Sequence, residues 1–369
     1  MRKFVHNSQK IASFLLVLIL LLPCFAFAEE QPVRLNSLIK ADTEQLEVRF
    51  LTTPTNAKSD ATLVICHGKE ELQVIIVDGG LANGCCLLEL ANLRKSLMES
   101  VGLGDQVKNK NYKLAVTLFA THCHRDHVEE LCVNILPSSL LTIDALYLPP
   151  ATALTSDGTY NNAKNGDLKY RPRLFNLMQF YTPNTPIYEL EYGQTLELEL
   201  ACGNAKIYAP LEDWGIGDKL KYIENVYYSG GNTLKRKDEV PNVVLNANCE
   251  WLHVSLGDYS VLFTGDIMKK KGDRSDEALD LMVNAYKDEV ISDIVKYPHH
   301  GIARNPAAPI VRDQLLKKGG IAVVTTNGAR DAAGRHLEML KTDYVTTEDG
   351  SYTFIIDESG IEYRLEDRQ

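Results

Sequence analysis

One short stretch, residues 118–131, constrains this chain more than any other part of its sequence. It reads LFATHCHRDHVEEL and places His122, His124, Asp126 and His127 within six positions, directly after an apolar run that predicts a buried strand. Residues two apart on an extended segment point to the same side, so we expect His122 and His124 to face one ion. As the chain turns into a helix, Asp126 and His127 face a neighbouring point. Imidazole and carboxylate ligands suit zinc, with manganese and iron as alternatives.

Two later segments also combine an apolar strand with ligand-type residues at its end. Residues 260–264 predict a buried strand that is followed by Gly265 and Asp266. A carboxylate at the tip of a buried strand is costly unless it meets a cation, so Asp266 is a candidate bridge between two ions. Residues 291–296 predict another such strand, which leads to His299 and His300. The three segments together predict a site for two metal ions.

The remaining pattern is one of apolar runs separated by turn residues and by helical segments. Predicted strands are residues 46–51, 61–66, 72–77, 114–120, 142–148, 187–190, 195–200, 205–208, 243–247, 251–256, 260–264, 291–296, 321–326, 352–356 and 361–365. Predicted helices are residues 87–101, 128–136, 169–180, 276–287, 307–317 and 332–340, and residues 210–241 predict a long loop. This mixture predicts an α/β (α+β) fold in which sheets carry helices on their outer faces.

The N-terminus has the order of a secretory signal: basic residues, an apolar run over residues 11–22, and the small-residue site Ala26-Phe27-Ala28. We expect a signal peptide over residues 1–28, a leader segment over 29–45 and a single domain with the metal-ligand motifs over 46–369. An uncleaved membrane anchor is the alternative, because the apolar run approaches spanning length. A signal peptide predicts a secreted, periplasmic or cell-surface protein, attached to a membrane only through an uncleaved N-terminus.

Charge and cysteine usage limit the partners and the covalent framework. Removal of residues 1–28 moves the formal net charge from -10 to -13, and so acidic a chain is not expected to form a stable complex with nucleic acid. A phosphate-bearing substrate would have to be held by metal ions or by a local patch. The eight cysteines do not predict a disulfide framework in a chain of this length, and individual pairs formed outside the cell are left open.

Several motifs carry a resemblance to a known family. THCHRDH matches the HxHxDH signature of the metallo-β-lactamase superfamily. DATLVI from Asp60, IIVDGG around Asp78, the FTGD strand, DIVKYPHHG and the tail RHLEMLKTDYVTTEDGSYTFIIDESG resemble the hydrolase domain of ComEC-type DNA-uptake proteins and their secreted relatives. The likeness runs from about residue 46 to residue 365. It implies an αββα four-layer sandwich with a dinuclear metal site at one edge.

The resemblance also implies roles for individual residues. His122 and His124 would bind the first ion, Asp126 and His127 the second, Asp266 would bridge the two, and His300 would complete the second ion's ligands. His299 would contact the substrate or assist the leaving group, and Asp126 and His299 are therefore the catalytic candidates. Asp78 would orient ligands without binding metal.

The sequence departs from that pattern in one respect. Many similar proteins supply a further histidine to the first ion, and His253 is the only histidine between the HxHxDH motif and Asp266. It falls in the middle of a predicted strand, where a half-buried structural role is favoured. Cys123 lies between two ligand histidines, but alternation points it to the opposite side, so a buried side chain is favoured there as well.

We therefore expect a metal-dependent hydrolase that uses two divalent ions, zinc before manganese or iron. Two ions roughly 3.5–4 Å apart typically supply hydroxide at neutral pH and stabilise an oxyanion. A phosphodiester, either nucleic acid or a cell-wall phosphoester, is the expected substrate. Opening of a β-lactam or lactone is one alternative. A metal-binding surface module without catalysis is the other, given the absent histidine.

Overall fold

The computed structural model describes residues 31–52, 59–153, 169–221, 240–267, 275–301, 307–325 and 337–366. Residues from Arg34 onward form one compact unit. The expected signal peptide lies outside the described residues. So do residues 222–239 of the predicted loop and residues 332–336 of the helix predicted over 332–340. No helix within the described ranges has both the length and the apolar character needed to span a bilayer.

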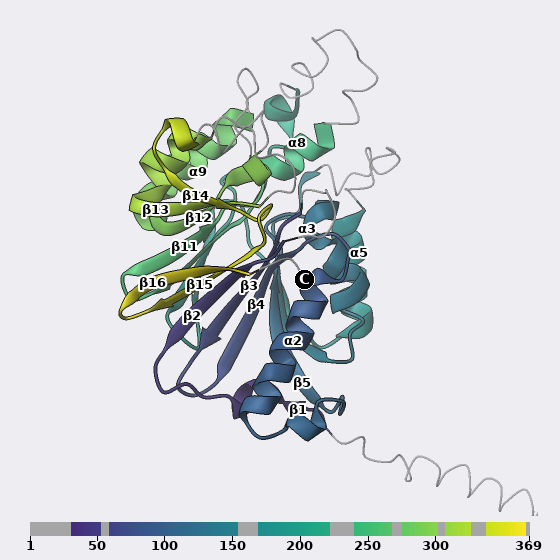
Figure 1. The fold of residues 1–369 in the computed structure, drawn as a ribbon. Coiled ribbons are helices and arrows are strands. Elements are labelled where there is room, and N and C mark those ends of the chain that lie inside the picture. The colour runs from purple at the N-terminus through teal and green to yellow at the C-terminus, as the bar shows by residue number, and fades with distance from the viewer. Residues whose placement is uncertain are drawn as a thin grey trace, which may run out of the picture. The chain divides into compact units, whose positions relative to one another are not determined.

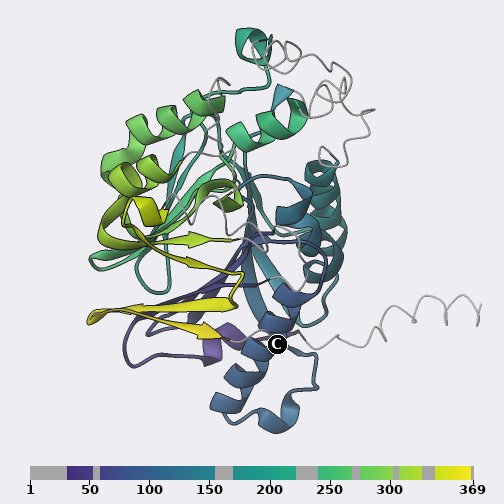
Figure 2. The ribbon, with the colours of Figure 1, turned by 45° about the horizontal axis from the view of Figure 1, so that its top comes forward.

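The first sheet has the strand order β16-β15-β2-β3-β4-β5-β6-β7. Its pairings are parallel from β4 to β7 and antiparallel elsewhere on this path. The C-terminal strands β15 and β16, in yellow in Figure 2, lie at one edge beside β2. The strands are β2 (Gln45–Phe50), β3 (Ala61–His67), β4 (Leu72–Gly79), β5 (Tyr112–Phe119), β6 (Leu141–Leu148), β7 (Ile187–Glu189), β15 (Ser351–Asp357) and β16 (Gly360–Glu366). A short strand, β1 (Val33–Arg34), precedes them.

The second sheet has the order β14-β13-β12-β11-β10-β9-β8. Pairings are parallel from β11 to β14 and antiparallel from β8 to β11. Gly257 and Asp258 form the predicted hairpin turn, since β10 and β11 pair antiparallel on either side of them. The strands are β8 (Thr195–Glu199), β9 (Asn204–Tyr208), β10 (Trp251–Leu256), β11 (Tyr259–Phe263), β12 (Ser292–Lys296), β13 (Leu316–Val324) and β14 (Asp343–Thr346).

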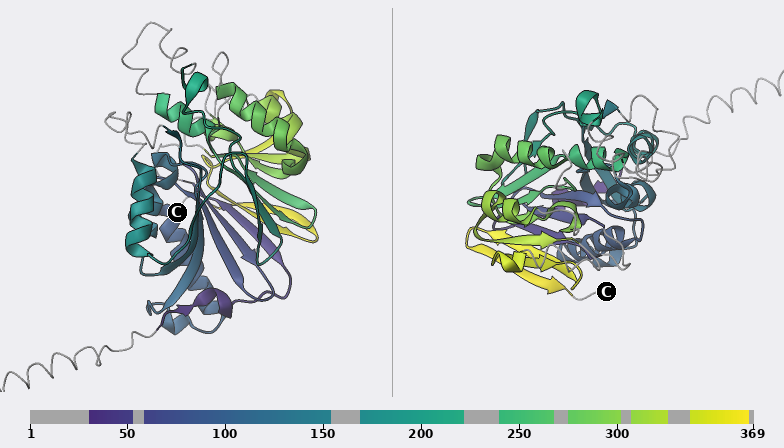
Figure 3. Two further views of the ribbon diagram at one scale, coloured as in Figure 1. Left: turned by 180° about the vertical axis from the view of Figure 1, so that it is seen from behind. Right: turned by 90° about the horizontal axis from the view of Figure 1, so that it is seen from above.

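Helices cover the outer face of each sheet, as Figures 1 and 3 show. The first sheet packs against α2 (Cys85–Ser100), α3 (Arg125–Glu130), the π-helical turn η4 (Leu131–Ile135) and α5 (Tyr170–Tyr181). The second packs against α8 (Val240–Ala247), α9 (Ser275–Val290), α10 (Ala308–Ile310) and the π-helical turn η6 (Val311–Leu315). Short 3-10 turns are η2 (Leu35–Leu38), η3 (Gly104–Gln106) and η5 (Pro298–Gly301).

A third apolar layer lies between the two sheets. It contains Val48 and Phe50 from the first sheet and Leu252 and Phe263 from the second, all buried. Side chains of a strand alternate between its faces, and one face of each sheet therefore meets the other sheet while the opposite face meets helices. The order of layers is helix, sheet, sheet, helix, and the predicted αββα sandwich is confirmed.

Two sequence predictions about local structure are wrong, and one strand was missed. Residues 243–247, predicted as a strand, belong to helix α8, because Val240, Val243, Val244 and Ala247 recur at helical spacing and all enter the outer core. The helix predicted over 307–317 ends at Leu315, and β13 begins at the next residue. Strand β14 was not predicted, since four residues reading DYVT give little periodic signal.

Candidate metal centre

Four strands end at the same edge of the sandwich and deliver the predicted site residues there. Strand β4 carries Asp78 near its end, and β5 leads into His122. Strand β11 leads into Asp266, and β12 leads into His299 and His300. Parallel strands that neighbour one another end at one edge of a sheet, so β4 with β5 and β11 with β12 each bring two such segments together.

The turn that precedes Asp266 requires a glycine. Gly265 has φ of 60°, and a Cβ atom at this position would lie 2.9 Å from Cys249 Sγ and from Thr121 Cβ. A side chain would therefore force this turn away from the segment that begins at Thr121. The absence of a side chain lets the second sheet's turn pack closely on the first sheet's histidine segment.

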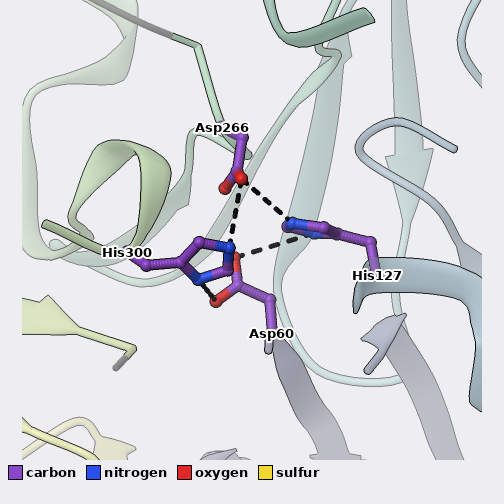
Figure 4. Close-up of side chains that lie close together, drawn as sticks. All are labelled: Asp60, His127, Asp266 and His300. Atoms are coloured by element: carbon purple, nitrogen blue, oxygen red, sulfur yellow. Dashed lines mark ion pairs between the residues drawn. The ribbon is translucent and has the colours of Figure 1, made fainter. Parts of the chain in front are cut away.

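Two buried imidazole rings, those of His127 and His300, lie beside one carboxylate oxygen of Asp266, as the close-up in Figure 4 shows. Asp266 Oδ2 lies 3.2 Å from His127 Nε2 and 3.1 Å from His300 Nε2. Asp60 Oδ1 lies 3.1 Å from His300 Nδ1, on the other side of that ring. The potential ligand atoms of Asp60, His127, Asp266 and His300 all lie within 4.8 Å of one another.

A second group of ligand atoms shares the same aspartate. His122 Nε2 and His124 Nδ1 are 2.9 Å apart. One potential ligand atom from each of these rings lies within 4.8 Å of a carboxylate oxygen of Asp266. His122 is 1% exposed and His124 is 7% exposed. Burial is the largest influence on the pKa of His122 and lowers it well below its ordinary value, so this imidazole is neutral at neutral pH. A neutral imidazole is the form that binds metal.

Asp78 contacts the His127 ring on the side opposite Asp266. Its Oδ2 lies 2.8 Å from His127 Nδ1, and the two carboxylate oxygens accept hydrogen bonds from the backbone N–H and the hydroxyl of Thr121, each at 2.8 Å. Burial raises the pKa of Asp78 although His127 opposes this. Contact with Nδ1 turns Nε2 of the same ring towards Asp266, which is the orienting role that the resemblance implies.

Two buried residues complete this arrangement, and the sequence did not single out either as a site residue. Lys296 Nζ pairs with Asp60 Oδ2, lies 3.2 Å from Asp266 Oδ1 and donates to the carbonyl oxygen of Gly265 at 2.8 Å. Lys296 and Asp60 are each 3% exposed. Because Oδ1 of Asp266 faces Lys296, the other oxygen of that carboxylate faces the imidazoles.

A signal for both residues was present in the sequence. Asp60 immediately precedes a strand that pairs antiparallel with β4, and that pairing places it at the same edge as Asp78. Lys296 ends an apolar strand, and a lysine there is costly to bury unless it meets a carboxylate.

The two catalytic candidates lie at the more exposed side of the cluster. Asp126 has a side chain that is 32% exposed, with Oδ2 3.5 Å from His300 Nε2. Burial alone would raise the pKa of Asp126, but His300 and His127 lower it to about 2. His299 has a side chain that is 18% exposed, with Nε2 3.8 Å from Asp266 Oδ2. Burial lowers the pKa of His299 to about 4, although Asp266 opposes this.

The backbone is strained at this edge. Four non-glycine residues in the described ranges have positive φ, and Asp78, His299 and His300 are three of them, with φ of 52°, 50° and 52°. Non-glycine residues in the left-handed region cost about 1–3 kcal/mol each and persist where the surrounding structure enforces them. The packed strand ends supply that enforcement here.

The residues present fit divalent metal ions. His127 Nε2 and His300 Nε2 are buried and make no hydrogen bond, although both face the same carboxylate oxygen. Imidazole nitrogen with carboxylate oxygen is a donor set for zinc, iron or manganese. Two groups of such donors that share Asp266 could hold two ions side by side and could activate water for hydrolysis.

Two residues that the sequence raised as possible ligands lie elsewhere. His253 is in the middle of β10, opposite Leu262 and Lys206, and it belongs to neither ligand group. Cys123 is buried in the outer layer of the first sheet together with Val128 and Cys132. Both positions agree with the structural roles that the sequence favoured.

Comparisons with known proteins returned similar structures but no similar sequences. No protein-family model matches the chain, and no curated protein matches it. The metallo-β-lactamase fold protein YhfI from Bacillus subtilis is 12% identical, with 85% of this chain and 99% of that chain covered and a TM-score of 0.44. Tm1679, a metal-dependent hydrolase of the β-lactamase superfamily, is 12% identical over 85% and 98%, with a TM-score of 0.42. Unliganded yeast PDE1 is 11% identical over 82% and 97%, with a TM-score of 0.41.

Proposed function

We propose that this chain is a metallohydrolase of the metallo-β-lactamase superfamily that binds two divalent metal ions. The observation that carries the proposal is the position of Asp266, whose carboxylate belongs to two groups of buried ligand atoms at once. One group has His127 and His300, and the other has His122 and His124. A carboxylate shared in this way is suited to bridge two ions. Zinc is the ion that we propose first.

The chain's own residues fall into three groups: metal ligands, residues that orient the ligands, and residues that face the substrate. His122, His124, His127, Asp266 and His300 would hold the ions, together with Asp126. Asp78 orients His127 through Nδ1 of its ring, and Nδ1 of His300 faces the carbonyl oxygen of Thr325 at 3.0 Å and Asp60 at 3.1 Å. When bound, the ions would supply an activated water and stabilise the developing oxyanion. His299, partly exposed beside Asp266, would contact the substrate or assist the leaving group.

A phosphodiester is the substrate class that we propose. The support is the resemblance of the IIVDGG, FTGD and DIVKYPHHG segments to ComEC-type hydrolases, together with the charge of the site. Lys296 is buried and already paired with two carboxylates, so it is not available to an incoming phosphate. The negative charge of a phosphodiester would therefore be met by the bound ions. This arrangement favours a small or wall-linked phosphoester over long nucleic acid, which needs an extended basic surface.

We also propose that the chain is exported through its N-terminal segment, with cleavage after Ala28. The support is the order of basic, apolar and small-residue regions in the sequence. Mass spectrometry of the protein from its native host should then find a mature chain that begins at Glu29. An intact N-terminus in the membrane fraction would instead indicate the uncleaved anchor.

The hydrolase proposal is tested with an aryl phosphodiester in the presence of zinc or manganese. We expect turnover by the purified protein, two ions per chain by elemental analysis, and loss of both in a variant that combines His122→Ala with Asp126→Asn. His253→Ala is the matched control, because it removes a histidine that lies outside both ligand groups. It should keep the metal content and the rate.

The same preparations distinguish the alternatives. Equal phosphodiester turnover by the wild type and the double variant would contradict the phosphodiesterase proposal. Hydrolysis of a chromogenic β-lactam or a lactone without phosphodiester turnover would move the chain to those substrates. Two bound ions without any hydrolysis would indicate a metal-binding module.

A further inference from the structure

Two buried cysteines from different sheets meet in the layer between the sheets. Cys66 lies on β3 and is 0% exposed, and Cys202 lies in the turn between β8 and β9 and is 1% exposed. Contact with Cys202 and burial raise the pKa of the Cys66 thiol well above its ordinary value. Cys202 Sγ also lies 3.1 Å from the carbonyl oxygen of Gln45, which neighbours the β2 residue opposite Cys66.

The turn that carries Cys202 is fixed from both sides. On the first sheet, the side chain of Gln73, opposite Cys66 on β4, accepts a hydrogen bond from the backbone N–H of Ala201 at 3.0 Å. Gly68 packs so closely that a Cβ atom there would lie 2.3 Å from the carbonyl oxygen of Ala201. On the second sheet, Gly203 has φ of 73°, and a Cβ atom there would lie 2.0 Å from the carbonyl oxygen of Ser255. The backbone thus holds the turn that carries Cys202 against the strands around Cys66, which is the placement that a disulfide between these residues requires.

We propose that Cys66 and Cys202 form a disulfide that joins the two sheets when the chain folds in an oxidising compartment. Each thiol loses its proton, an S–S bond forms, and the two electrons reduce a small-molecule disulfide such as oxidised glutathione to two thiols. The pairing rests on the proposed export, because structural disulfides form and persist outside the cytosol. It does not rest on the proposed hydrolase activity. Since both sulfur atoms are buried in the folded chain, the bond forms during folding, before the turn closes over β3.

The disulfide would lie at the opposite end of the sandwich from the candidate metal centre. Cys66 is six residues from Asp60 along β3, which corresponds to about 20 Å of extended strand. The bond should therefore change stability without changing metal binding. That separation keeps the two proposals independently testable.

The test is refolding of the full-length mature chain from denaturant, once with reducing agent and once in a buffer of reduced and oxidised glutathione. Free thiols are then blocked and the digest is analysed by mass spectrometry. We expect a peptide pair that links Cys66 to Cys202 in the glutathione sample. The loop closed by that bond is long, so reduction should lower Tm by roughly 5–10 °C. Zinc content should be the same in both samples.

Variants separate this bond from general thiol effects. Cys66→Ser together with Cys202→Ser should refold to a protein whose Tm does not respond to reducing agent. Cys85→Ser removes a thiol on α2 and should keep both the linked peptide and the Tm response. If the double variant does not fold, the linked peptide of the wild type still decides the question.

Two outcomes overturn the pairing: both thiols remain open to alkylating reagent after refolding in glutathione, or either cysteine links to a different partner. A linked peptide after refolding, with reduced thiols in protein taken from the native host, supports the pairing and contradicts export instead. Absence of phosphodiester turnover bears on neither result.

Discussion

The protein buries two clusters of charged side chains, and the two are balanced differently. In the first, the side chain of Glu47 accepts a hydrogen bond from Arg49 Nε at 2.7 Å and lies 3.1 Å from His67 Nε2, while Arg49 also pairs with Glu89. Each charged group there has a partner of opposite sign. The candidate metal centre has four aspartates and one lysine. Lys296 pairs with Asp60 and Asp266, while Asp78 and Asp126 lie beside histidine nitrogens.

The difference separates a structural ion-pair network from a binding site. In the Glu47 cluster, burial would raise the pKa of the carboxyl, but His67 and Arg49 lower it to about 2, and the network is complete without a ligand. In the metal centre of the metal-free chain, burial lowers the pKa of His127, but Asp266 and Asp78 raise it to about 10. The carboxylates around His127 therefore favour its protonated form, and a divalent ion would supply that positive charge instead. A cluster that needs added positive charge is the one to test for metal.

The largest effect is expected from Asp266→Asn. Both ligand groups share this carboxylate, so its neutral amide should reduce the metal content from two ions to fewer than one. Phosphodiester turnover should fall by about 1000-fold or more. Elemental analysis and steady-state kinetics measure the two changes. Asp293→Asn, on β12 but outside both ligand groups, is the control and should keep the metal content.

Lys296→Met should give the next largest effect, and one that depends on metal. Removal of the ammonium leaves Asp60 and Asp266 buried together, which should cost about 3–5 kcal/mol of unfolding free energy in the metal-free chain. Bound zinc replaces the lost positive charge, so the cost should shrink when zinc is saturating. Denaturant unfolding with and without zinc measures both values.

The control for this variant is Lys317→Met. Lys317 pairs with Asp293 at 2.8 Å, and its side chain is 36% exposed, so its removal should cost less than about 1 kcal/mol. That cost should be the same with and without zinc. Equal losses for Lys296→Met in the two conditions would contradict the assignment of Lys296 to the metal centre.

Glu47→Gln should destabilise the protein in a way that depends on pH and not on metal. The folded-state pKa of Glu47 is about 2 against an ordinary value of 4.5, so the stabilisation is complete above about pH 4.5 and is lost as pH falls towards 2. Wild type should exceed the variant by about 2–3 kcal/mol at pH 7, and the gap should close near pH 2. Unfolding curves over this pH range, with chelator and with zinc, measure it. A gap that persists unchanged at pH 2 would show that packing, and not the ion pair, is responsible.

Asp78→Asn should have the smallest effect, on metal affinity alone. The amide can donate a hydrogen bond to His127 Nδ1, which would favour the proton on Nε2, the nitrogen that faces Asp266. Affinity for the second ion should fall about 10- to 100-fold. Competition with a chromogenic chelator gives the constant. Unchanged affinity would mean that packing alone orients the ring.

Much of the fold could be predicted because long apolar runs bounded by turn residues have one consistent interpretation. The strand predicted over residues 72–77 became Leu72–Gly79, and that over 251–256 became Trp251–Leu256. The failure at residues 243–247 has a physical cause: a run of five residues, four of them apolar, fits a strand and a helix equally well. Val240 and Ala247, just outside or at the end of that window, supply the helical spacing that decides it.

The candidate site could be predicted in outline, because each ligand-type residue follows its own apolar strand. The structure brings His122, His124, His127, Asp266 and His300 together, and their roles as ligands stay a prediction. Asp60 and Lys296 were not anticipated, since neither belongs to a motif with ligand spacing. The sequence carried a signal for each, a carboxylate before a strand and a lysine at the end of an apolar strand. The strand pairing and the neighbouring carboxylate that give these signals their meaning are seen in the folded chain.

The spread of the site along the chain also sets the order of events during maturation. Residues that meet around Asp266 come from position 60 at one extreme and position 300 at the other. A chain still emerging from the ribosome or the export machinery would lack the complete set of these residues until about four-fifths of its length had appeared. The site can therefore assemble only late in synthesis, and bound ions would come from the compartment in which folding ends.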